Sequence, residues 1–332
     1  MTRVLVVGAG ISGLLCARTV RDVGLPVTVL DKGRGVGGRM ATRRVDGAVF
    51  DHGAQFFTCR DEGFAAVVRD LTEAGATHPW FRGLLTFGGG LVDDGGDRYR
   101  GDPGMTAPAK ALAAALEVRT GTRVVAVVAD GDRWSVRSED GTADDADVLV
   151  LTAPVPQSVA LLDAGDVRLE RDLRSRLDRV SYDPCLAVLA TLAEPTTLPD
   201  PGALRPAEEP VVWITDNQRK GISPIPAVTI HAGPHTSRDL WDEPDAVVVR
   251  ELTRAVRPLG VGEPLTAHVV RWRYATPIDP LPERCLATTA PLPLVLAGDA
   301  FGGPRVEGAA LSGLAAGTAA AALGREHDAR TT

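Results

Sequence analysis

The stretch RVLVVGAGISGLLCA, residues 3–17, decides the fold. It opens with a short apolar run of the kind that forms a buried parallel strand, and it continues with apolar residues at helical spacing. Between the two lies Gly8-x-Gly10-x-x-Gly13. The first glycine permits a tight turn, the second lets a pyrophosphate approach the backbone, and the third lets the helix pack on the sheet. The stretch therefore predicts a dinucleotide-binding turn between a strand and a helix whose N-terminus favours anions.

A second buried strand follows at residues 27–30, so the order strand–helix–strand predicts a right-handed crossover and a parallel sheet. Asp31 stands at the end of this strand, where an acidic side chain accepts hydrogen bonds from ribose hydroxyls. A merely flexible glycine loop is the alternative interpretation, and the position of Asp31 argues against it.

Glycines and arginines are interspersed directly behind that strand, in DKGRGVGGRMATRR, residues 31–44. Gly37 and Gly38 let the chain run close to a phosphate, which Arg39 can meet as a bidentate charged donor. A solvated basic loop is the simpler interpretation for Arg34, Arg43 and Arg44. The segment predicts a second phosphate-binding element.

A third element is LVLAGDAFGGPRVEGAALSG, residues 294–313. A buried strand delivers Asp299 at its end, and a helix begins within a few residues. Asp299 is placed to bind a polyol chain, and the helix N-terminus can face a ring carbonyl that becomes negative on reduction. An aspartate that only caps a helix is the alternative at this position.

Periodicity predicts the remaining elements. We expect helices at 62–73, 106–116, 168–180, 246–256 and 309–323. We expect a hairpin at 121–142, a buried strand at 148–151, and strands of a second sheet at 186–192, 211–215, 228–231 and 268–274.

The composition narrows the class of protein. The 332 residues are 44% apolar and 24% charged, which is ordinary for a globular enzyme with two packed units. A net charge of -7 argues against a general nucleic-acid binder. The 4 cysteines form no C-x-x-C pair, which predicts a reduced, cytoplasmic chain without a disulfide framework or zinc cluster. The apolar tract 309–323 is too short to span a bilayer, so we expect no membrane partner.

Together these elements resemble FAD-binding proteins of the glutathione-reductase/amine-oxidase type, which hold the cofactor with the same three pieces. Residues 122–125 look like the strand that contacts adenine, and residues 147–154 look like the return strand near the flavin. The resemblance implies noncovalent FAD, because no cysteine lies in the motif used for covalent attachment. The cofactor-binding residues that it implies are Gly8, Gly10, Ile11, Ser12, Gly13, Asp31, Lys32, Gly38, Arg39, Met40, Gln55, Phe56, Val124, Asp299 and Val306.

A narrower resemblance rests on GRGVGGRMATRR (33–44), DHGAQFFTCRD (51–61), PGMTAPAK (103–110), RWRYA (271–275) and GPRVEGAALSG (303–313). These strings are similar to bacterial renalase-type proteins over essentially the whole chain. The resemblance implies oxidation of isomeric dihydronicotinamide dinucleotides, the 2- and 6-dihydro forms, to NAD(P)+. Hydride would pass to flavin N5, and O2 would reoxidise the flavin to give hydrogen peroxide. The residues that would line the substrate side are Phe57, Thr58, Arg60 and Asp61.

Such a substrate requires positioning and charge stabilisation more than a general base, because losing a hydride restores the aromatic ring. The sequence agrees, since it contains no nucleophile elbow, convincing triad or metal-ligand spacing. Candidates for the ring are Phe57, Tyr182 and Trp272, and candidates for the phosphates are Arg60, Arg98 and Arg305. His231 and His235 are further pocket candidates, with a packed or solvent-facing histidine as the alternative for each. His235 stands in residues 233–237, where the family leads us to expect an aromatic residue.

The sequence therefore predicts an α/β protein with a discontinuous Rossmann-like FAD-binding domain, residues 1–60, 103–157 and 286–332. A second, α+β substrate domain on a mixed or antiparallel sheet is expected at 61–102 and 158–285. An FAD-dependent amine oxidase or desaturase acting on a small biosynthetic intermediate shares every FAD motif. A flavin monooxygenase shares the Gly-Asp strand but not the Gly-Gly-Arg element. A flavoprotein sensor or binding module without turnover is the alternative from another class.

Overall fold

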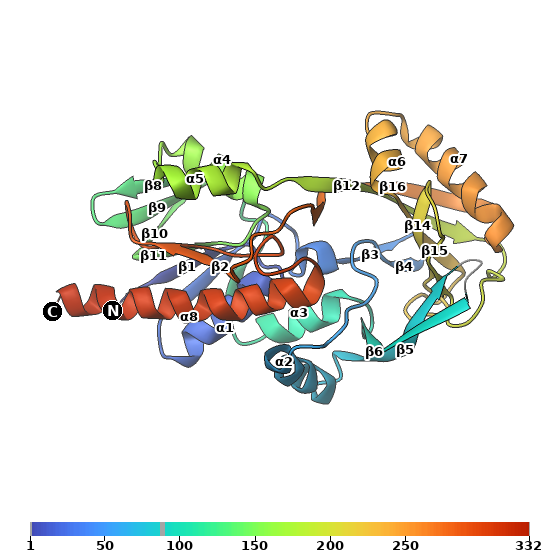
Figure 1. Ribbon diagram of the computed structural model, residues 1–332, viewed down its shortest axis with the longest axis horizontal. Helices are drawn as coiled ribbons and strands as arrows, with labels where there is room; N and C mark the ends of the chain where they lie inside the picture. The colour runs from blue at the N-terminus through green and yellow to red at the C-terminus, as the bar shows by residue number, and fades with distance from the viewer. Residues whose placement is uncertain (1, 87–89, 332) are drawn as a thin grey trace. The chain divides into compact units, whose positions relative to one another are not determined.

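A six-stranded, mostly parallel sheet organises the first of two units into which the chain divides (Figure 1). The computed structural model describes residues 2–86 and 90–331. The described parts of 1–38, 109–181 and 277–332 form the first unit, and those of 39–108 and 182–276 form the second.

The central strands of this sheet are the ones that the glycine fingerprint predicts. β1 (Val4–Val7) pairs in parallel with β2 (Val27–Leu30) on one side and β11 (Val148–Leu151) on the other. The full order is β17-β18-β11-β1-β2-β7, with β7 (Glu117–Arg119), β18 (Leu294–Leu296) and an antiparallel edge strand β17 (Leu286–Thr288). β1 and β11 are buried along their whole length, as apolar strands covered on both faces must be. The Rossmann-like fold is confirmed.

A smaller three-stranded sheet completes the β structure of this unit. The predicted hairpin forms as β8 (Val124–Asp130) and β9 (Arg133–Ser138), and β10 (Ala143–Ala146) extends it. Two helices follow, α4 (Val155–Ala164) and α5 (Arg171–Asp178).

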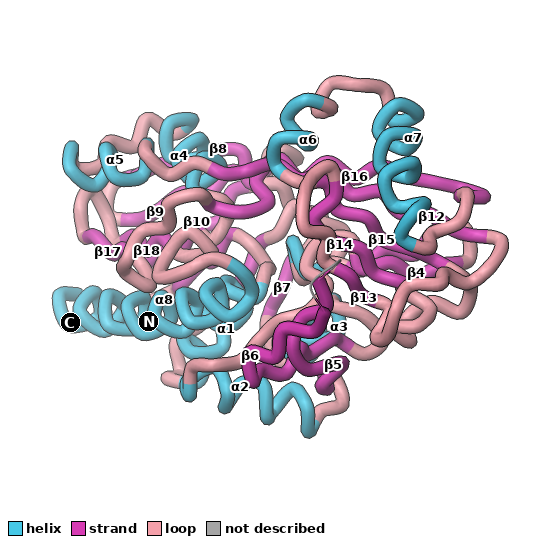
Figure 2. Tube along the Cα trace, turned by 45° about the vertical axis from the view of Figure 1, so that its right-hand side comes forward, coloured by secondary structure: helices cyan, strands magenta, loops and turns pink. Residues whose placement is uncertain are grey.

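The two longest helices of the first unit lie side by side, as both views show (Figures 1 and 2). α1 spans Ile11–Asp22, and α8 spans Arg305–Thr331, which is longer than the 309–323 tract expected from the sequence. Its part Arg305–Ala329 is long and apolar enough to cross a membrane by length and composition alone. Glycines of α8 nevertheless lie against the α1 backbone, because a Cβ at Gly313 would sit 2.2 Å from the Ser12 carbonyl oxygen. Core packing against α1 therefore accounts for this composition.

This close approach makes a testable prediction. Gly313→Ala should lower the free energy of unfolding of the apoprotein by roughly 2–3 kcal/mol, because the new methyl group pushes the two helices apart. Gly324→Ala in the same helix is the matched control. Its Cβ would meet only side-chain atoms, with Leu25 Cδ1 at 3.0 Å, and alanine is the better helix former. Urea denaturation should therefore rank Gly313→Ala well below a near-neutral Gly324→Ala; equal losses would contradict the packing.

The second unit is built on a five-stranded sheet in the order β13-β14-β15-β12-β16. Its strands are β12 (Tyr182–Leu192), β13 (Ala203–Leu204), β14 (Val211–Asp216), β15 (Ala227–Ala232) and β16 (Pro264–Pro277). The pairs β13–β14, β14–β15 and β15–β12 are antiparallel. α6 (Pro234–Asp239) follows β15, and α7 (Asp245–Val256) lies over the sheet, where Val248, Leu252 and Val256 are fully buried. The predicted α+β unit on an antiparallel sheet is thus observed.

Several elements of the second unit were not predicted. A hairpin of β3 (Thr42–Val45) and β4 (Ala48–Asp51) buries Phe50 with Leu189 of the large sheet. A second hairpin is formed by β5 (Thr77–Thr86) and β6 (Gly90–Gly101). The helix α2 (Glu62–Glu73) of this unit was predicted. The helix α3 (Thr106–Ala113), whose residues from 109 on belong to the first unit, was predicted with a longer C-terminal end.

The division into units differs from the expected domain boundaries. Residues 39–60 and 103–108 were expected with the FAD-binding segments, but they belong to the second unit. The reason is that β4 and the start of α3 form hydrogen bonds within that unit, as described below. Residues 158–181 and 277–285 belong to the first unit instead, where α4 lies against β8.

Candidate cofactor and substrate sites

The turn from β1 to α1 has the geometry that a bound phosphate requires. Gly8 has φ +114°, a conformation that side chains disfavour. A Cβ at Gly13 would lie 1.9 Å from the Gly8 carbonyl oxygen, whereas a Cβ at Gly10 would meet nothing within 4 Å. The first and third glycines are thus needed by the protein itself. The space at Gly10 is left open, which fits the approach of a pyrophosphate.

The N-terminus of α1 offers free donors beside that space. No side chain caps the helix, and its first internal hydrogen bond runs from the Leu14 N–H to the Gly10 carbonyl. The Ser12 hydroxyl is buried and has no hydrogen-bond partner among the described residues. A buried hydroxyl without a partner costs free energy, so an anion at this terminus would satisfy it as well as the helix N–H groups.

Asp31 ties the neighbouring loop to this turn. Its carboxylate accepts hydrogen bonds from the Ala9 N–H and the Gly33 N–H, both at 2.6 Å. The Gly37 N–H donates to the Ala9 carbonyl at 2.8 Å, which brings the glycine-rich segment back beside the fingerprint. Each carboxylate oxygen keeps a lone pair, so the ribose role of Asp31 stays a prediction compatible with its structural one.

The third predicted element ends at the same edge of the sheet, because β18 runs parallel to β11. Gly298 follows β18 with φ +133°, and its N–H donates to the Ser312 hydroxyl at 2.9 Å. Asp299 comes next and is 6% exposed. α8 then begins at Arg305, so a second helix N-terminus lies a few residues beyond the strand, as at the first turn. Val306 is buried and Arg305 is exposed.

The adenine-side segment also lies beside Asp31. The N–H groups of Gly121 and Thr122 donate to the carbonyls of Gly33 and Asp31, at 2.7 and 2.8 Å. Buried Val124 begins β8 directly afterwards. The first unit therefore brings together the fingerprint, the end of β2, the end of β18 and the start of β8, which the sequence places far apart. The remaining residue of this group, Lys32, is exposed and points to Gln157, with Nζ and Oε1 3.5 Å apart.

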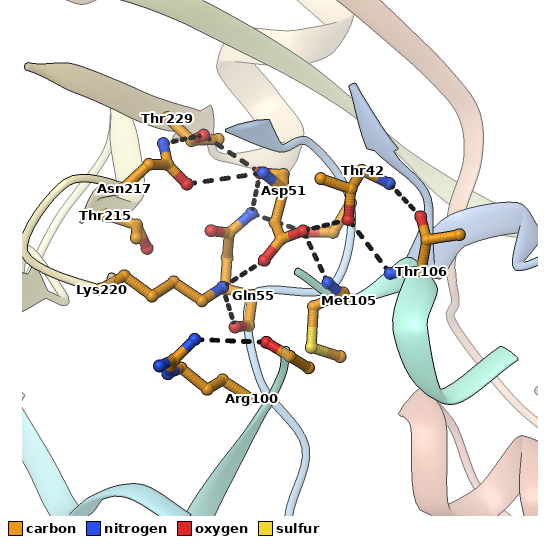
Figure 3. Close-up of polar contacts among 12 residues, drawn as sticks. Thr42, Asp51, Gln55, Arg100, Met105, Thr106, Thr215, Asn217, Lys220 and Thr229 are labelled. Atoms are coloured by element: carbon orange, nitrogen blue, oxygen red, sulfur yellow. Dashed lines mark hydrogen bonds and ion pairs between the residues drawn. The ribbon is translucent and has the colours of Figure 1, made fainter. Parts of the chain in front are cut away.

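The second unit holds a buried polar cluster centred on Asp51 and Lys220, both fully buried (Figure 3). Asp51 Oδ2 lies 2.6 Å from Lys220 Nζ, and Asp51 Oδ1 accepts from the Thr42 hydroxyl at 2.6 Å and the Met105 N–H at 2.8 Å. Burial lowers the pKa of Lys220, and the Asp51 carboxylate opposes that shift. The pair joins β3, β4, the start of α3 and the turn after β14. We call these residues, together with Gln55, the Asp51–Lys220 cluster.

Gln55 is held by its own loop. Its side-chain Nε2 donates to the backbone carbonyl oxygens of Asp51 at 2.6 Å and Gly53 at 3.0 Å. The backbone carbonyl oxygen of Gln55 accepts from Lys220 Nζ at 2.5 Å. The side chain is 5% exposed, and its Oε1 has no hydrogen-bond partner among the described residues.

Aromatic rings surround Phe56, the residue after Gln55. The Phe56 ring centroid lies 5.1 Å from that of Trp213 and 5.9 Å from that of Phe81. The Arg98 guanidinium lies 5.8 Å from the Phe56 centroid, and Lys220 Nζ lies 5.0 Å from that of Trp80. This aromatic surface with adjacent cations suits a flat ring. The sequence pattern did not single out Trp80, Phe81 or Trp213.

Several predicted substrate residues have structural roles. Phe57 is 3% exposed and stacks on Tyr99, with centroids 5.5 Å apart. Asp61 caps α2 by accepting from the Gly63 N–H at 2.8 Å. His235 has an exposed side chain at the start of α6. Phe57 thus packs in the core and Asp61 caps a helix, and the substrate role of each stays a prediction. Thr58 is half-buried and Arg60 exposed, so both remain predictions.

Three other candidates, Arg39, Tyr182 and Trp272, lie on β16 or beside it. Arg39 Nη1 donates to the carbonyls of Tyr274 at 3.1 Å and Ala275 at 3.3 Å, and its guanidinium lies 6.0 Å from the centroid of Tyr182. Trp272 Nε1 donates to the His52 carbonyl at 2.8 Å, and its ring stacks on the His52 imidazole. One nitrogen of the Arg39 guanidinium thus donates to carbonyl oxygens of β16. The phosphate-binding role of Arg39 stays a prediction. Met40, the next residue, is buried.

Two histidines are held neutral in this unit. Burial lowers the pKa of both His52 and His231 from the usual 6.5 to about 4; the positive charges of Arg43, for His52, and Lys220, for His231, act in the same direction. His52 Nδ1 and His231 Nε2 are buried without a hydrogen-bond partner among the described residues. His231 was predicted as a pocket residue, whereas His52 was not.

These shifts predict a stability profile. Between pH 6.5 and about 4 the unfolded chain binds a proton at each histidine and the folded chain does not, so stability falls as pH decreases. The expected slope is roughly 1.4 kcal/mol per pH unit for each histidine. Urea denaturation of the apoprotein from pH 7.5 to 4.5 measures it. His231→Asn should flatten the profile; a slope equal to that of the parent chain would contradict the lowered pKa of His231.

Two family models match the chain. One described as flavin containing amine oxidoreductase matches residues 81–321, which is more than half of the sequence. One described as an NAD(P)-binding Rossmann-like domain matches residues 6–71.

Individual relatives match over shorter regions. Renalase of Mus musculus is 30% identical over 193 residues, which are 55% of this chain and 56% of that protein. Hydroxyneurosporene desaturase of Rubrivivax gelatinosus is 47% identical over 74 residues, which are 21% of this chain and 14% of that protein. The match to renalase therefore spans about half of its length, and the match to the desaturase much less.

Solved structures match nearly the whole chain at low identity. A crystal structure provisionally assigned as a protoporphyrinogen oxidase of Exiguobacterium sp. 255-15 has a TM-score of 0.75 at 16% identity, covering 97% of this chain and 99% of that one. A putrescine oxidase variant has a TM-score of 0.72 at 16% identity, with the same coverage. At this identity the likeness concerns the fold.

Proposed function

Since the chain belongs to the family of flavin-containing amine oxidoreductases, with FAD as its cofactor, we propose that it is a renalase-like oxidase. Its substrates would be isomeric dihydronicotinamide dinucleotides, the 2- and 6-dihydro forms of NAD(P), and its products NAD(P)+ and hydrogen peroxide. The observation that carries the proposal is the match to renalase over 193 residues, against 74 residues for the desaturase.

The structure supports the cofactor part in the first unit. The open space at Gly10, the uncapped α1 N-terminus and the buried Ser12 hydroxyl fit a pyrophosphate. When bound, the flavin supplies the chemistry, accepting two electrons and a proton as hydride and passing electrons to O2. The protein chain would therefore bind the cofactor and the substrate, orient them toward each other and exclude water.

The second unit supports the substrate part. Hydride loss from a dihydropyridine forms an aromatic ring and leaves no proton for a base to take. The buried ammonium group of Lys220 is engaged by Asp51 and the Gln55 carbonyl, so it is a fixed positive charge rather than a free base. Phe56, Trp213 and the Arg98 guanidinium supply an aromatic surface beside a cation, which suits a flat ring attached to phosphates.

An anaerobic screen tests the proposal. The FAD-loaded protein is mixed with 2- and 6-dihydro-NAD(P), with ordinary NADPH and with putrescine, and the visible flavin absorbance is followed. Rapid bleaching by the isomers alone, followed by one hydrogen peroxide per NAD(P)+ once O2 is admitted, is the expected result. Bleaching by NADPH would contradict the proposal. So would a flavin that none of the compounds bleaches, which would favour a sensor without turnover.

An amine oxidase or desaturase is the second candidate. It is favoured by the family model and by the likeness of the fold to putrescine oxidase. Bleaching by amines in the same screen, with the dihydronicotinamide isomers inert, would select it.

A further inference from the structure

Gln55 presents a buried acceptor whose direction is fixed. Both hydrogens of its side-chain amide are used on carbonyl oxygens, those of Asp51 at 2.6 Å and Gly53 at 3.0 Å. Exchanging the amide O and N would place Oε1 against two other acceptors, so the chemistry settles this orientation. The Oε1 atom then has no partner among the described residues, although the side chain is only 5% exposed.

An unsatisfied buried acceptor of this kind indicates a ligand. Leaving a buried carbonyl oxygen unpaired costs roughly 1–3 kcal/mol, and the N–H group of a bound ring would remove that cost.

Lys220 controls where this acceptor points. Its ammonium group donates hydrogen bonds to the Asp51 carboxylate at 2.6 Å and to the backbone carbonyl oxygen of Gln55 at 2.5 Å. One cation therefore holds both ends of residues 51–55 (Figure 3). The face of Trp80 takes up its remaining side at 5.0 Å. It is one of only three lysines in the sequence, and a fully buried lysine is rare unless paired.

We propose that Lys220 is a positioning residue, which fixes residues 51–55 so that Gln55 Oε1 accepts a hydrogen bond from the cofactor. The inference rests on the proposed function only for the identity of the ligand, FAD. Lys220 would touch neither cofactor nor substrate and would act through Gln55. Its removal should therefore matter for FAD binding only while Gln55 is present.

A double-mutant cycle on the apoprotein tests this coupling. FAD dissociation constants are measured by fluorescence for the parent chain, Lys220→Met, Gln55→Leu and the double variant. Lys220→Met should weaken binding about tenfold in the parent and less than twofold in the Gln55→Leu background, because the lost hydrogen bond is the same one. Lys110→Met, at an exposed position of α3, is the matched control and should bind FAD as the parent does.

The stability of the same proteins separates positioning from folding. The loss of apoprotein stability caused by Lys220→Met should be similar in both backgrounds, whereas its effect on FAD affinity should not. If Lys220→Met fails to fold, the neutral combination of Asp51→Asn with Lys220→Met removes the unpaired charge and should show the same background-dependent loss.

Two results would overturn the inference. One is equal weakening in both backgrounds, which would make Lys220 a purely structural residue. The other is unchanged affinity in Lys220→Met. Either could occur in a chain whose parent takes up FAD and is bleached by the dihydronicotinamide isomers, so the proposed function would survive. A parent that takes up no FAD would overturn both.

Discussion

Replacing Gly10 with alanine is expected to weaken FAD binding on the order of 100-fold while leaving the apoprotein folded. Gly10 has φ -74° and ψ 175°, which alanine adopts without strain, and its Cβ would meet no atom of the protein within 4 Å. The methyl group would instead occupy the space through which a pyrophosphate reaches the α1 N-terminus. Loss of two charge-assisted hydrogen bonds, at about 1.5 kcal/mol each, corresponds to this factor.

The apoprotein itself should become slightly more stable. A glycine replaced by alanine at a compatible conformation gains roughly 0.4–1 kcal/mol through the unfolded state. Gly262→Ala is the matched control, because its Cβ also meets nothing within 4 Å and the residue lies in the second unit. FAD titration and thermal melting of both variants measure the effect. A Gly10→Ala protein that binds FAD like the parent would contradict the binding of the pyrophosphate in the open space at Gly10.

The largest stability effect is expected at Asp51. Asp51→Ala leaves the Lys220 ammonium group buried without its counter-charge, and it also removes the acceptor of the Thr42 hydroxyl and the Met105 N–H. Breaking a buried ion pair from one side costs about 3–5 kcal/mol. The expected result is a second unit that is largely unfolded in mild urea. Tryptophan fluorescence reports on it, because Trp80, Trp213, Trp241 and Trp272 lie in that unit.

An exposed ion pair provides the control. Asp22 lies 2.5 Å from Arg21, but its side chain is 58% exposed, so Asp22→Ala should change stability by less than about 1 kcal/mol. The double variant that combines Asp51→Asn with Lys220→Met should lose less stability than Asp51→Ala, because it leaves no unpaired charge. Comparable losses for Asp51→Ala and Asp22→Ala would contradict the burial of the pair.

The sequence predicted the parts of the fold whose signals are local. The β1–α1 turn could be predicted because Gly8 and Gly13 have backbone roles that no other residue fills. β3 was missed because its residues Thr42–Val45 include the exposed, charged Arg43 and Arg44 and show no apolar alternation. It forms because the β4 strand beside it buries Phe50 in the second unit.

The Asp51–Lys220 cluster could not be predicted, because its two charges are 169 positions apart. Lys220 lies in DNQRKG, residues 216–221, a composition typical of a polar surface turn. The one available signal was the scarcity of lysine in a chain whose positive charge is almost entirely arginine. The substrate role of Phe57 comes from the family-specific string that contains it and stays a prediction, while its ring packs against Tyr99 and Phe64.

The visible spectrum of the purified chain, before and after denaturation, shows whether the protein binds FAD and whether it does so noncovalently. We expect a yellow protein that releases one FAD per chain on denaturation without proteolysis, and a folded Gly10→Ala variant that retains much less flavin. A colourless parent that takes up no added FAD, or a flavin that stays attached to the denatured chain, would contradict noncovalent binding of FAD by this protein.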